Sequence, residues 1–185
     1  MYNKLLLTGV PGVGKTYLLN KVINALKIES TILLGFTTQE ITDNLGNRIA
    51  FELVSVKNPT DRKILSSLND IEEGNVTKFG RWNVSVDSIT YFSEKYMKEP
   101  ENRTIFILDE IGPMQCQSKE FMDGVRRLLQ SKCIIIGTIK LTRCGIQYID
   151  DFIAEVKSIL AGNIMTITLD NRDIIYEDIM KMIFV

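Results

Sequence analysis

A glycine-rich octapeptide near the start of the chain constrains the fold more than any other feature. It reads Gly9-Val10-Pro11-Gly12-Val13-Gly14-Lys15-Thr16. An apolar run, residues 4–8, comes directly before it, and apolar residues at helical spacing follow from Leu18 to Leu26. The pattern G-x-x-x-x-G-K-[ST] works as the turn that leads from a buried strand into the first turn of a helix. The chain is therefore expected to contain a strand, this loop and a helix in that order.

The residue types in this octapeptide suit the binding of a triphosphate. Its glycines permit a close approach, so that successive N–H groups converge on phosphate oxygens at the positive end of the helix. Lys15 is expected to reach the β- and γ-phosphates and to act in catalysis, and the Thr16 hydroxyl to ligate Mg²⁺. The alternative is a glycine- and proline-rich turn with a solvated lysine, and the flanking strand and helix argue against it. We therefore assign residues 9–16 as nucleotide-binding, with Mg²⁺ as the expected cofactor.

A pair of adjacent carboxylates forms the second candidate feature. The run from residue 104 to 108 is β-branched and apolar, as in a strand buried on both faces, and it ends in Asp109-Glu110. In open α/β sheets, ligands bind at the carboxyl ends of the strands. Asp109 is expected to hold Mg²⁺ through water together with Thr16, and Glu110 to orient and deprotonate the attacking water. The alternative is that the pair caps the next helix or begins a solvated loop.

Composition narrows the function classes. Twenty-two Lys and Arg against 23 Asp and Glu give a net charge of −1 over 185 residues, so no strong field favours nucleic acid or an anionic membrane. Apolar stretches are far shorter than the roughly 20 residues that span a bilayer. The absence of histidine and of C-x-x-C spacing argues against zinc sites and histidine-based catalysis. We expect one cytoplasmic domain, residues 1–185, without a signal peptide and with its thiols reduced.

Strand and helix patterns alternate along the chain, which predicts an α/β fold with a mainly parallel sheet and helices on both faces. The strands expected after the first are residues 31–37, 48–56, 82–86, 104–108, 133–138 and 164–169. The helices expected after the first are residues 87–98, 118–130, 147–160 and a final one from about residue 172. A turn signal at residues 43–47 predicts an antiparallel pair, so residues 40–86 are expected to form a β-rich antiparallel insertion. Cys133 is expected to be a buried strand residue.

The order of these motifs resembles the division of P-loop proteins that has an added central strand and a catalytic glutamate, to which RecA-like and AAA+ ATPases belong. That resemblance implies the strand order 5-1-4-3-2 for the parallel part of the sheet and hydrolysis as the usual chemistry. Nucleotide kinases look different, because they carry arginine-rich lid segments over the acceptor. The candidate lid here, residues 140–145, contains one arginine.

The assembled motifs resemble a family, the small P-loop nucleoside-triphosphatases of thermophilic bacteria and archaea, known in vertebrates as the cancer-related nucleoside-triphosphatase. Beyond the phosphate loop, the similar segments are residues 35–40 (GFTTQE), 109–114 (DEIGPM), 118–121 (SKEF), 137–139 (GTI) and 171–173 (NRD). The resemblance covers nearly the whole chain. It implies Mg²⁺-dependent hydrolysis of ATP, GTP, CTP and UTP to the diphosphate and phosphate, with broad base tolerance and slow turnover.

Three residues outside the two main motifs are further candidates. Thr138 ends a strand that should neighbour the phosphate loop, so its hydroxyl would read the γ-phosphate or bond its own backbone. Lys140 stands where the family tends to have proline, and is either a solvated loop lysine or a phosphate contact. Arg172 follows Asp170-Asn171, which resembles a helix N-cap, and the family resemblance raises it as a nucleotide contact.

Other arginines and aromatic residues have simpler interpretations. Arg126 and Arg127 are expected to form an outward pair with salt bridges, and without an arginine finger in cis turnover should be slow. Four aromatic residues that would be able to stack on a base are expected to be core residues instead: Phe36, Trp82, Tyr91 and Phe92. Loose base selectivity follows as the default expectation.

Three function classes stay open from the sequence. The leading hypothesis is a stand-alone nucleoside-triphosphatase. The second is a P-loop kinase that transfers the γ-phosphoryl group to a small acceptor, with Glu110 again as the base. The third is a slowly cycling nucleotide switch whose insertion, residues 40–86, changes its affinity for a partner with nucleotide state. The sequence does not indicate nucleic acid as a partner, and it leaves the protein partner unknown.

Overall fold

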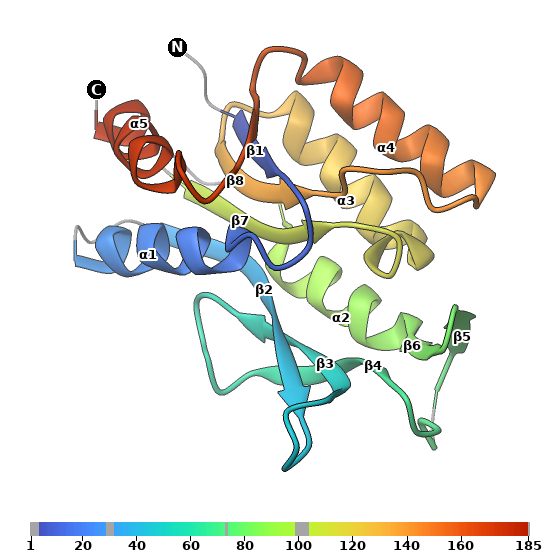
Figure 1. The fold of residues 1–185 in the computed structure, drawn as a ribbon. Helices are drawn as coiled ribbons and strands as arrows, with labels where there is room; N and C mark the ends of the chain where they lie inside the picture. Colours follow the sequence, from blue (N-terminus) through green and yellow to red (C-terminus); the bar gives the residue numbers. More distant parts are fainter. Residues whose placement is uncertain (1–3, 29–31, 73, 99–103, 185) are drawn as a thin grey trace.

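The computed structural model describes residues 4–28, 32–72, 74–98 and 104–184. Figure 1 shows the chain. Its elements, in order, are β1 (Lys4–Thr8), α1 (Lys15–Ile28), β2 (Ile32–Thr42), β3 (Arg48–Ser55), β4 (Arg62–Ser67), β5 (Val76–Phe79), β6 (Trp82–Ser85), α2 (Val86–Tyr96), β7 (Thr104–Ile111), a short 3-10 turn η1 (Gln115–Gln117), α3 (Lys119–Gln130), β8 (Ile134–Ile139), α4 (Gln147–Ile159), β9 (Ile164–Thr166) and α5 (Arg172–Phe184).

Within the described residues, nine strands form one sheet in the order β5-β6-β4-β3-β2-β7-β8-β1-β9. From β2 to β9 all neighbouring strands pair in parallel. Numbered along the chain, these five parallel strands lie in the order 2-3-4-1-5, which is 5-1-4-3-2 from the other edge. The predicted RecA-like order is therefore confirmed. It places the strand that carries the phosphate loop two positions from β7, with β8 between them.

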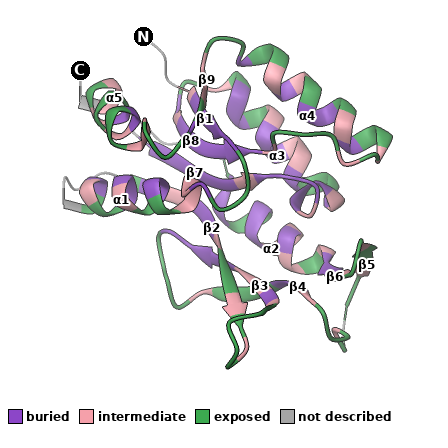
Figure 2. Cartoon of the chain, viewed as in Figure 1, coloured by how far each residue is buried: buried purple, intermediate pink, exposed green. Residues whose placement is uncertain are grey.

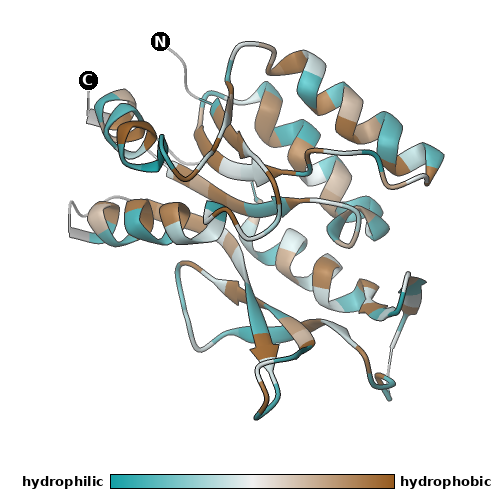
Figure 3. Cartoon of the chain, in the orientation of Figure 1, coloured by the Kyte–Doolittle hydropathy of each residue, from teal (hydrophilic) through white to brown (hydrophobic). Residues whose placement is uncertain are grey.

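Two apolar layers, one on each face of the sheet, form the core. Alternate residues of a strand point to opposite faces, so Leu6 packs with the layer of α2, α3 and α4, whereas Leu5 and Leu7 pack with the layer of α1 and α5. Figure 1 shows these helices on the two faces, and Figures 2 and 3 show that the central strands are buried and apolar along most of their length. Burial on both faces explains why these strands read as continuous apolar runs.

The β-rich insertion extends the same sheet. β2 pairs in parallel with β7 up to Phe36 and continues to Thr42 in antiparallel pairing with β3, so residues 40–42 belong to the antiparallel part, as predicted. β3, β4, β6 and β5 then pair antiparallel in turn. The sequence did not predict β4 or β5, because β4 is mostly polar and β5 spans four residues. Pairing with a neighbouring strand, rather than its own apolar pattern, defines β4.

Two predicted strand boundaries are corrected by side-chain hydrogen bonds to the backbone. The strand expected over residues 82–86 ends at Ser85, whose hydroxyl accepts a hydrogen bond from the Ser88 N–H at 3.2 Å and caps α2. The strand expected over residues 164–169 ends at Thr166, because the N–H of Thr168 turns to the Asn171 side chain at 2.8 Å. Thr31, the first residue of another expected strand, lies outside the described residues. Cys133 is buried, one residue before β8.

Helix length and polarity bear on membrane insertion. No helix in the described ranges is both long enough and apolar enough to cross a bilayer.

A polar cluster around Asp61 fastens the antiparallel strands to helix α2. Asp61 lies between β3 and β4, and its carboxylate accepts hydrogen bonds from the Tyr91 hydroxyl at 3.0 Å, from Lys95 Nζ at 2.7 Å and from the Tyr96 hydroxyl. Burial raises the pKa of Asp61, but these hydrogen bonds and the Lys95 charge outweigh it and leave the pKa below its usual value. The charged carboxylate therefore stabilises the fold.

We predict that Asp61→Asn lowers the free energy of unfolding by about 1–3 kcal/mol at pH 7, because the charge-assisted hydrogen bonds are weakened. A folded-state pKa below the unfolded value of about 3.9 means that the stabilisation is present at neutral pH and is lost as the pH falls through the folded pKa. Urea unfolding at several pH values should show the two proteins converging in acid. Asp178→Asn, at an exposed position on α5, is the control, and an Asp61→Asn curve that coincides with wild type at pH 7 would contradict the prediction.

Candidate active site

The phosphate loop joins the end of β1 to the start of α1 and is fixed by two glycines. A Cβ on Gly9 would lie 2.8 Å from the carbonyl oxygen of Ile167, so only glycine permits the chain to approach there. Gly14 has φ +100°, and a Cβ there would lie 2.8 Å from Nη1 of Arg172. Lys15 Nζ donates to the carbonyl oxygens of Gly9 at 3.0 Å and of Val10 at 3.2 Å. The loop therefore holds its lysine folded back across its own backbone.

Asp109 lies at the end of β7, where four elements meet. Its side chain is buried, with 3% of the residue exposed. One carboxylate oxygen accepts a hydrogen bond from Thr16 Oγ1 at 2.9 Å and the other from Thr138 Oγ1 at 2.6 Å. The Asp109 carbonyl oxygen accepts a third bond from Thr38 Oγ1 at 2.5 Å. Burial raises the pKa of Asp109, and the two threonine hydroxyls, the Thr38 bond and the Lys15 charge oppose that rise.

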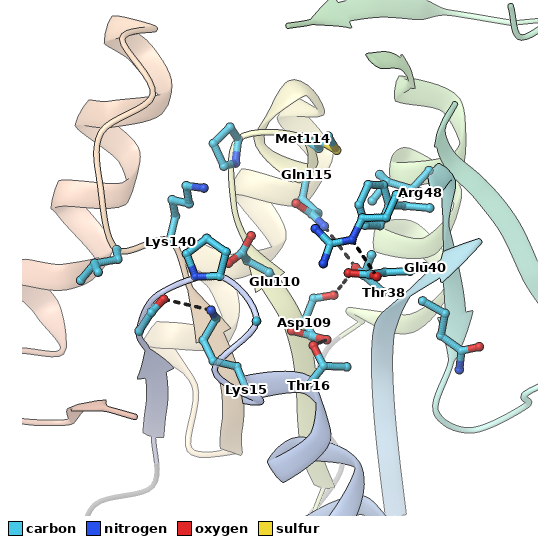
Figure 4. Close-up of a pocket in the computed structure, with 18 of the residues that line it drawn as sticks. Lys15, Thr16, Thr38, Glu40, Arg48, Asp109, Glu110, Met114, Gln115 and Lys140 are labelled. Atoms are coloured by element: carbon cyan, nitrogen blue, oxygen red, sulfur yellow. Dashed lines mark hydrogen bonds and ion pairs between the residues drawn. The ribbon is translucent and has the colours of Figure 1, made fainter. Parts of the chain in front are cut away.

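Glu110 is the second carboxylate of the pair and faces two lysines. Burial raises its pKa, as does the neighbouring charge of Asp109, whereas the charges of Lys140 and Lys15 lower it. Figure 4 shows Glu110 between the phosphate loop and Lys140. A Cβ on Gly112 would lie 2.6 Å from Glu110 Oε2 and 3.0 Å from its Cγ, so glycine at this position leaves room for the glutamate side chain. Glu110 is therefore a carboxylate whose proton affinity is increased, positioned next to cations.

One pocket of about 630 Å³ brings these groups together. Its walls come from the phosphate loop, the end of β7 with the segment that follows, the segment after β8, and the antiparallel strands. The lining residues are Gly9, Val10, Pro11, Gly12, Lys15, Thr16, Asn20, Thr38, Gln39, Glu40, Arg48, Phe51, Leu65, Phe79, Asp109, Glu110, Pro113, Met114, Gln115, Lys140, Leu141 and Thr142. Figure 4 shows Lys15, Thr16, Asp109 and Glu110 together, with the Glu40–Arg48 ion pair beside Asp109 and Thr38.

The remaining predicted site residues lie close to this pocket without lining it. Val13 is buried and packs in the core layer of α1. Thr138 is fully buried, and its hydroxyl bonds the Asp109 carboxylate rather than its own backbone. Arg172 lies beside Gly14 with its guanidinium 5.7 Å from the centre of the Tyr17 ring. The structure thus places Arg172 at the phosphate loop, on the side opposite the pocket wall formed by β2 and β3.

Other residues that the sequence singled out lie away from the pocket. Arg126 pairs with Glu155 at 2.8 Å and with Asp123 at 3.3 Å, as predicted, whereas Arg127 donates instead to the Met97 carbonyl oxygen at 3.1 Å. Of the four aromatic residues, Phe36 and Phe92 are fully buried against each other, Trp82 packs on Phe51 with ring centres 5.0 Å apart, and the Tyr91 hydroxyl bonds Asp61.

The sequence reasoning missed the side of the pocket formed by β2 and η1. Thr38 bonds the Asp109 backbone, and Gln115 Nε2 donates to Thr38 Oγ1 at 3.3 Å. Arg48 Nε pairs with Glu40 at 2.8 Å and also lines the pocket. A signal was present: Thr37-Thr38-Gln39-Glu40 are polar residues that follow an apolar parallel strand, and such strand ends gather around ligands in α/β sheets.

A family sequence model and the most similar known proteins point to the same family. The sequence model of the NTPase family matches residues 4–180. Nucleoside-triphosphatase THEP1 from Aquifex aeolicus is 28% identical, over 97% of this chain and 98% of its own length. The cancer-related nucleoside-triphosphatase homolog from Mus musculus is 30% identical, over 99% and 97% respectively.

Solved structures agree with the sequence comparisons. The crystal structure of THEP1 from Aquifex aeolicus has a TM-score of 0.78 and 28% identity, covering 98% of this chain and 99% of that one. The solution structure of a human cancer-related nucleoside triphosphatase has a TM-score of 0.72 and 26% identity, covering 99% and 98%. Since the family match spans almost the whole chain and the fold agrees from end to end, the chain belongs to the NTPase family, as its motifs predicted.

Proposed function

We propose that this protein hydrolyses nucleoside 5′-triphosphates to nucleoside diphosphates and phosphate. One observation carries the proposal: Lys15 and Thr16 of the phosphate loop share a single pocket with the carboxylates of Asp109 and Glu110. A cation for the phosphates, oxygen donors for a metal and a carboxylate for the attacking water are the parts that this reaction requires. The names of the relatives, which are nucleoside-triphosphatases, support the same reaction class.

Each residue has a distinct role in the proposed reaction. The N–H groups of the loop and the Lys15 ammonium bind the β- and γ-phosphates and balance the charge that develops on them. Glu110 accepts a proton from the water whose oxygen attacks the γ-phosphorus. The bond from that phosphorus to the β–γ bridging oxygen breaks, and its electron pair leaves with the diphosphate. Burial keeps the Glu110 carboxylate more basic than an exposed one, which suits a proton acceptor.

The donor set suits Mg²⁺. Thr16 Oγ1 and a carboxylate oxygen of Asp109 lie 2.9 Å apart, and both are hard oxygen donors. Within the described residues, no three His, Cys, Asp or Glu side chains gather as a metal site, so waters and phosphate oxygens would complete the coordination. When bound, the ion neutralises phosphate charge. Thr138 would hold the Asp109 carboxylate in place, and thus act on the metal rather than on the γ-phosphate.

The surroundings of the site support broad base tolerance and slow turnover. Phe36 and Phe92 are buried in the core and are not accessible to a base, so no dedicated stacking residue comes from that set. Arg172, beside Gly14, would contact the nucleotide from the side of the loop. Because Arg126 is held in ion pairs, we propose that no arginine finger from its helix serves the site and that the protein alone turns over slowly. Its free thiols suit the cytoplasm.

The proposal predicts phosphate release from ATP, GTP, CTP and UTP in the presence of Mg²⁺ and without any acceptor. We expect the four values of kcat/KM to lie within about 100-fold of one another, since a larger ratio requires dedicated hydrogen bonds to the base. Turnover should stay below about one per second in the absence of a partner. A phosphate-release assay measures both quantities. No release from any of the four nucleotides despite tight binding would overturn the proposal.

Substitutions of Lys15 and Glu110 should impair different steps, nucleotide binding and catalysis respectively. Lys15→Ala removes a charge from the bound triphosphate, so its dissociation constant should rise about 10- to 100-fold. Glu110→Gln should leave binding nearly unchanged and lower kcat by about 10²- to 10⁴-fold, because a general base acts mainly in the transition state. Equilibrium binding and single-turnover assays separate the two effects. Lys27→Ala, at an exposed position near the end of the same helix, is the matched control, and an equal loss of binding in both variants would exclude Glu110 as the base.

Metal removal tests the Thr16–Asp109 assignment. Chelation with EDTA should abolish phosphate release, and added Mg²⁺ should restore it. Thr16→Ala should raise the Mg²⁺ concentration that gives half-maximal activity by about tenfold, which corresponds to the loss of one ligand interaction of roughly 1.4 kcal/mol. Thr16→Ser should restore the wild-type concentration, because the hydroxyl ligand returns. Full activity in EDTA would show that no divalent ion takes part.

A further inference from the structure

The pocket extends beyond the phosphate loop and the two carboxylates. Its volume of about 630 Å³ is typical of sites for small organic molecules and includes the end where the triphosphate would bind. The half opposite the phosphate loop is lined by Arg48, Phe51, Leu65, Phe79, Met114 and Gln115. We call these six residues the far lobe. They come from β3, β4, β5 and the η1 segment, so the antiparallel strands supply most of this wall.

The nucleoside end of a bound triphosphate would point away from the far lobe. In a phosphate loop the backbone N–H groups hold the α- and β-phosphates and the lysine reaches the β- and γ-phosphates. The nucleoside therefore leaves on the side of the residues that end the loop, and there Arg172 lies beside Gly14. Arg172 follows β9, and β9 lies on one side of β1 in the sheet. The strands β8, β7, β2 and β3 lie on the other side of β1, so the far lobe and Arg172 are on opposite sides of the phosphate loop.

Strand spacing shows how far the far lobe extends from the loop. Phe51 is on β3, four strand positions from β1, or roughly 19 Å at about 4.8 Å per strand. The γ-phosphate end of the nucleotide therefore faces this half of the pocket, and Glu110 lines the same pocket (Figure 4). A molecule seated in the far lobe would therefore lie on the γ-phosphate side of the nucleotide, and only the end that extends toward Glu110 would take the place of the attacking water.

The far lobe is built to hold a flat ring with a polar edge. Phe51, Leu65, Phe79 and Met114 give it apolar walls, and the Phe51 ring is fixed by edge-on packing against Trp82. Two polar groups lie among these walls. Residue Gln115 is 4% exposed and its amide is oriented by the bond to Thr38, whereas the Arg48 guanidinium, on a half-exposed side chain, pairs with Glu40. A few preorganised polar groups within apolar walls are the usual features of a small-molecule site.

We propose that the far lobe is an acceptor site for a nucleoside, which takes the γ-phosphoryl group in place of water. The proposal rests on the function proposed above for the phosphate-loop end of the pocket. The base would stack within the apolar walls while Gln115 and Arg48 bond its edge, and a ribose hydroxyl would face Glu110. That hydroxyl oxygen bonds to the γ-phosphorus, the bond to the bridging oxygen breaks with its electron pair on the diphosphate, and the hydroxyl proton passes to Glu110. The products are a nucleoside monophosphate and a nucleoside diphosphate.

The test follows the γ-phosphoryl group. ATP labelled on its γ-phosphorus is incubated with the full chain and Mg²⁺, alone and with adenosine, guanosine, cytidine or uridine, and the products are separated. We expect labelled nucleoside monophosphate with at least one nucleoside and a matching fall in free phosphate. Phosphate release that none of the four nucleosides accepts or alters would overturn the acceptor site and leave the hydrolase proposal standing. Transfer to a nucleoside without any phosphate release in its absence would overturn the hydrolase proposal and support the acceptor site. If neither transfer nor phosphate release occurs, both proposals are overturned.

Two variants locate the acceptor. Phe79→Ala removes a ring from the wall, and Arg48→Met removes the guanidinium from an exposed position while keeping most of the bulk. Each should lower the ratio of transfer to free phosphate release at least tenfold, whereas Leu45→Ala should not change it. Leu45, at the β2–β3 turn, is 86% exposed and outside the pocket. A nucleoside that raises the KM for ATP equally in wild type and Phe79→Ala would occupy the base site of the triphosphate instead, which would overturn the proposal.

Discussion

A buried carboxylate, Asp109, fixes the geometry on which the whole site depends. An unpaired charge in the interior is costly, so each of its oxygens needs a hydrogen-bond donor. Thr16 supplies one from the start of α1 and Thr138 the other from the end of β8, while Thr38 on β2 bonds the Asp109 backbone. The strands β2, β7, β8 and β1 are neighbours in the sheet, and these bonds fix their carboxyl ends relative to one another. The phosphate loop therefore lies in a fixed position next to the carboxylates.

Features determined by local sequence were predicted well. A phosphate loop is a contiguous motif whose strand and helix directly adjoin it, and the central strands are buried on both faces, so their apolar runs are unambiguous. The order of the parallel strands also followed, although only through resemblance to other P-loop proteins, because no local pattern encodes which strands pair. The apolar residues at helical spacing predicted α1, α2, α3 and α4, with ends within a few residues of those in the structure.

Features determined by long-range contacts were missed. Thr38 meets Asp109 across 71 positions of the chain, and Gln115 meets Thr38 across 77. Neither contact leaves a periodic signal, since a single polar residue at a strand end has many possible partners. The strand β4 was missed for a related reason: residues such as Arg62 and Lys63 do not indicate a strand by themselves, and β3 imposes the conformation through its backbone. The partner of Thr138 likewise depended on the register of β8 beside β7.

The sheet divides the chemistry of the pocket between its two halves. The parallel strands end in the loop, the carboxylates and the hydroxyls that any nucleoside-triphosphate site of this type requires, and their arrangement is dictated by Asp109. The antiparallel strands form the opposite wall of the same pocket, with Phe51, Leu65 and Phe79 on three successive strands of the chain. Asp61 anchors this wall to α2 through charge-assisted bonds. If phosphoryl transfer proceeds as proposed, the antiparallel strands would decide whether water or a second molecule attacks, while the parallel strands would supply the groups that act on the phosphates.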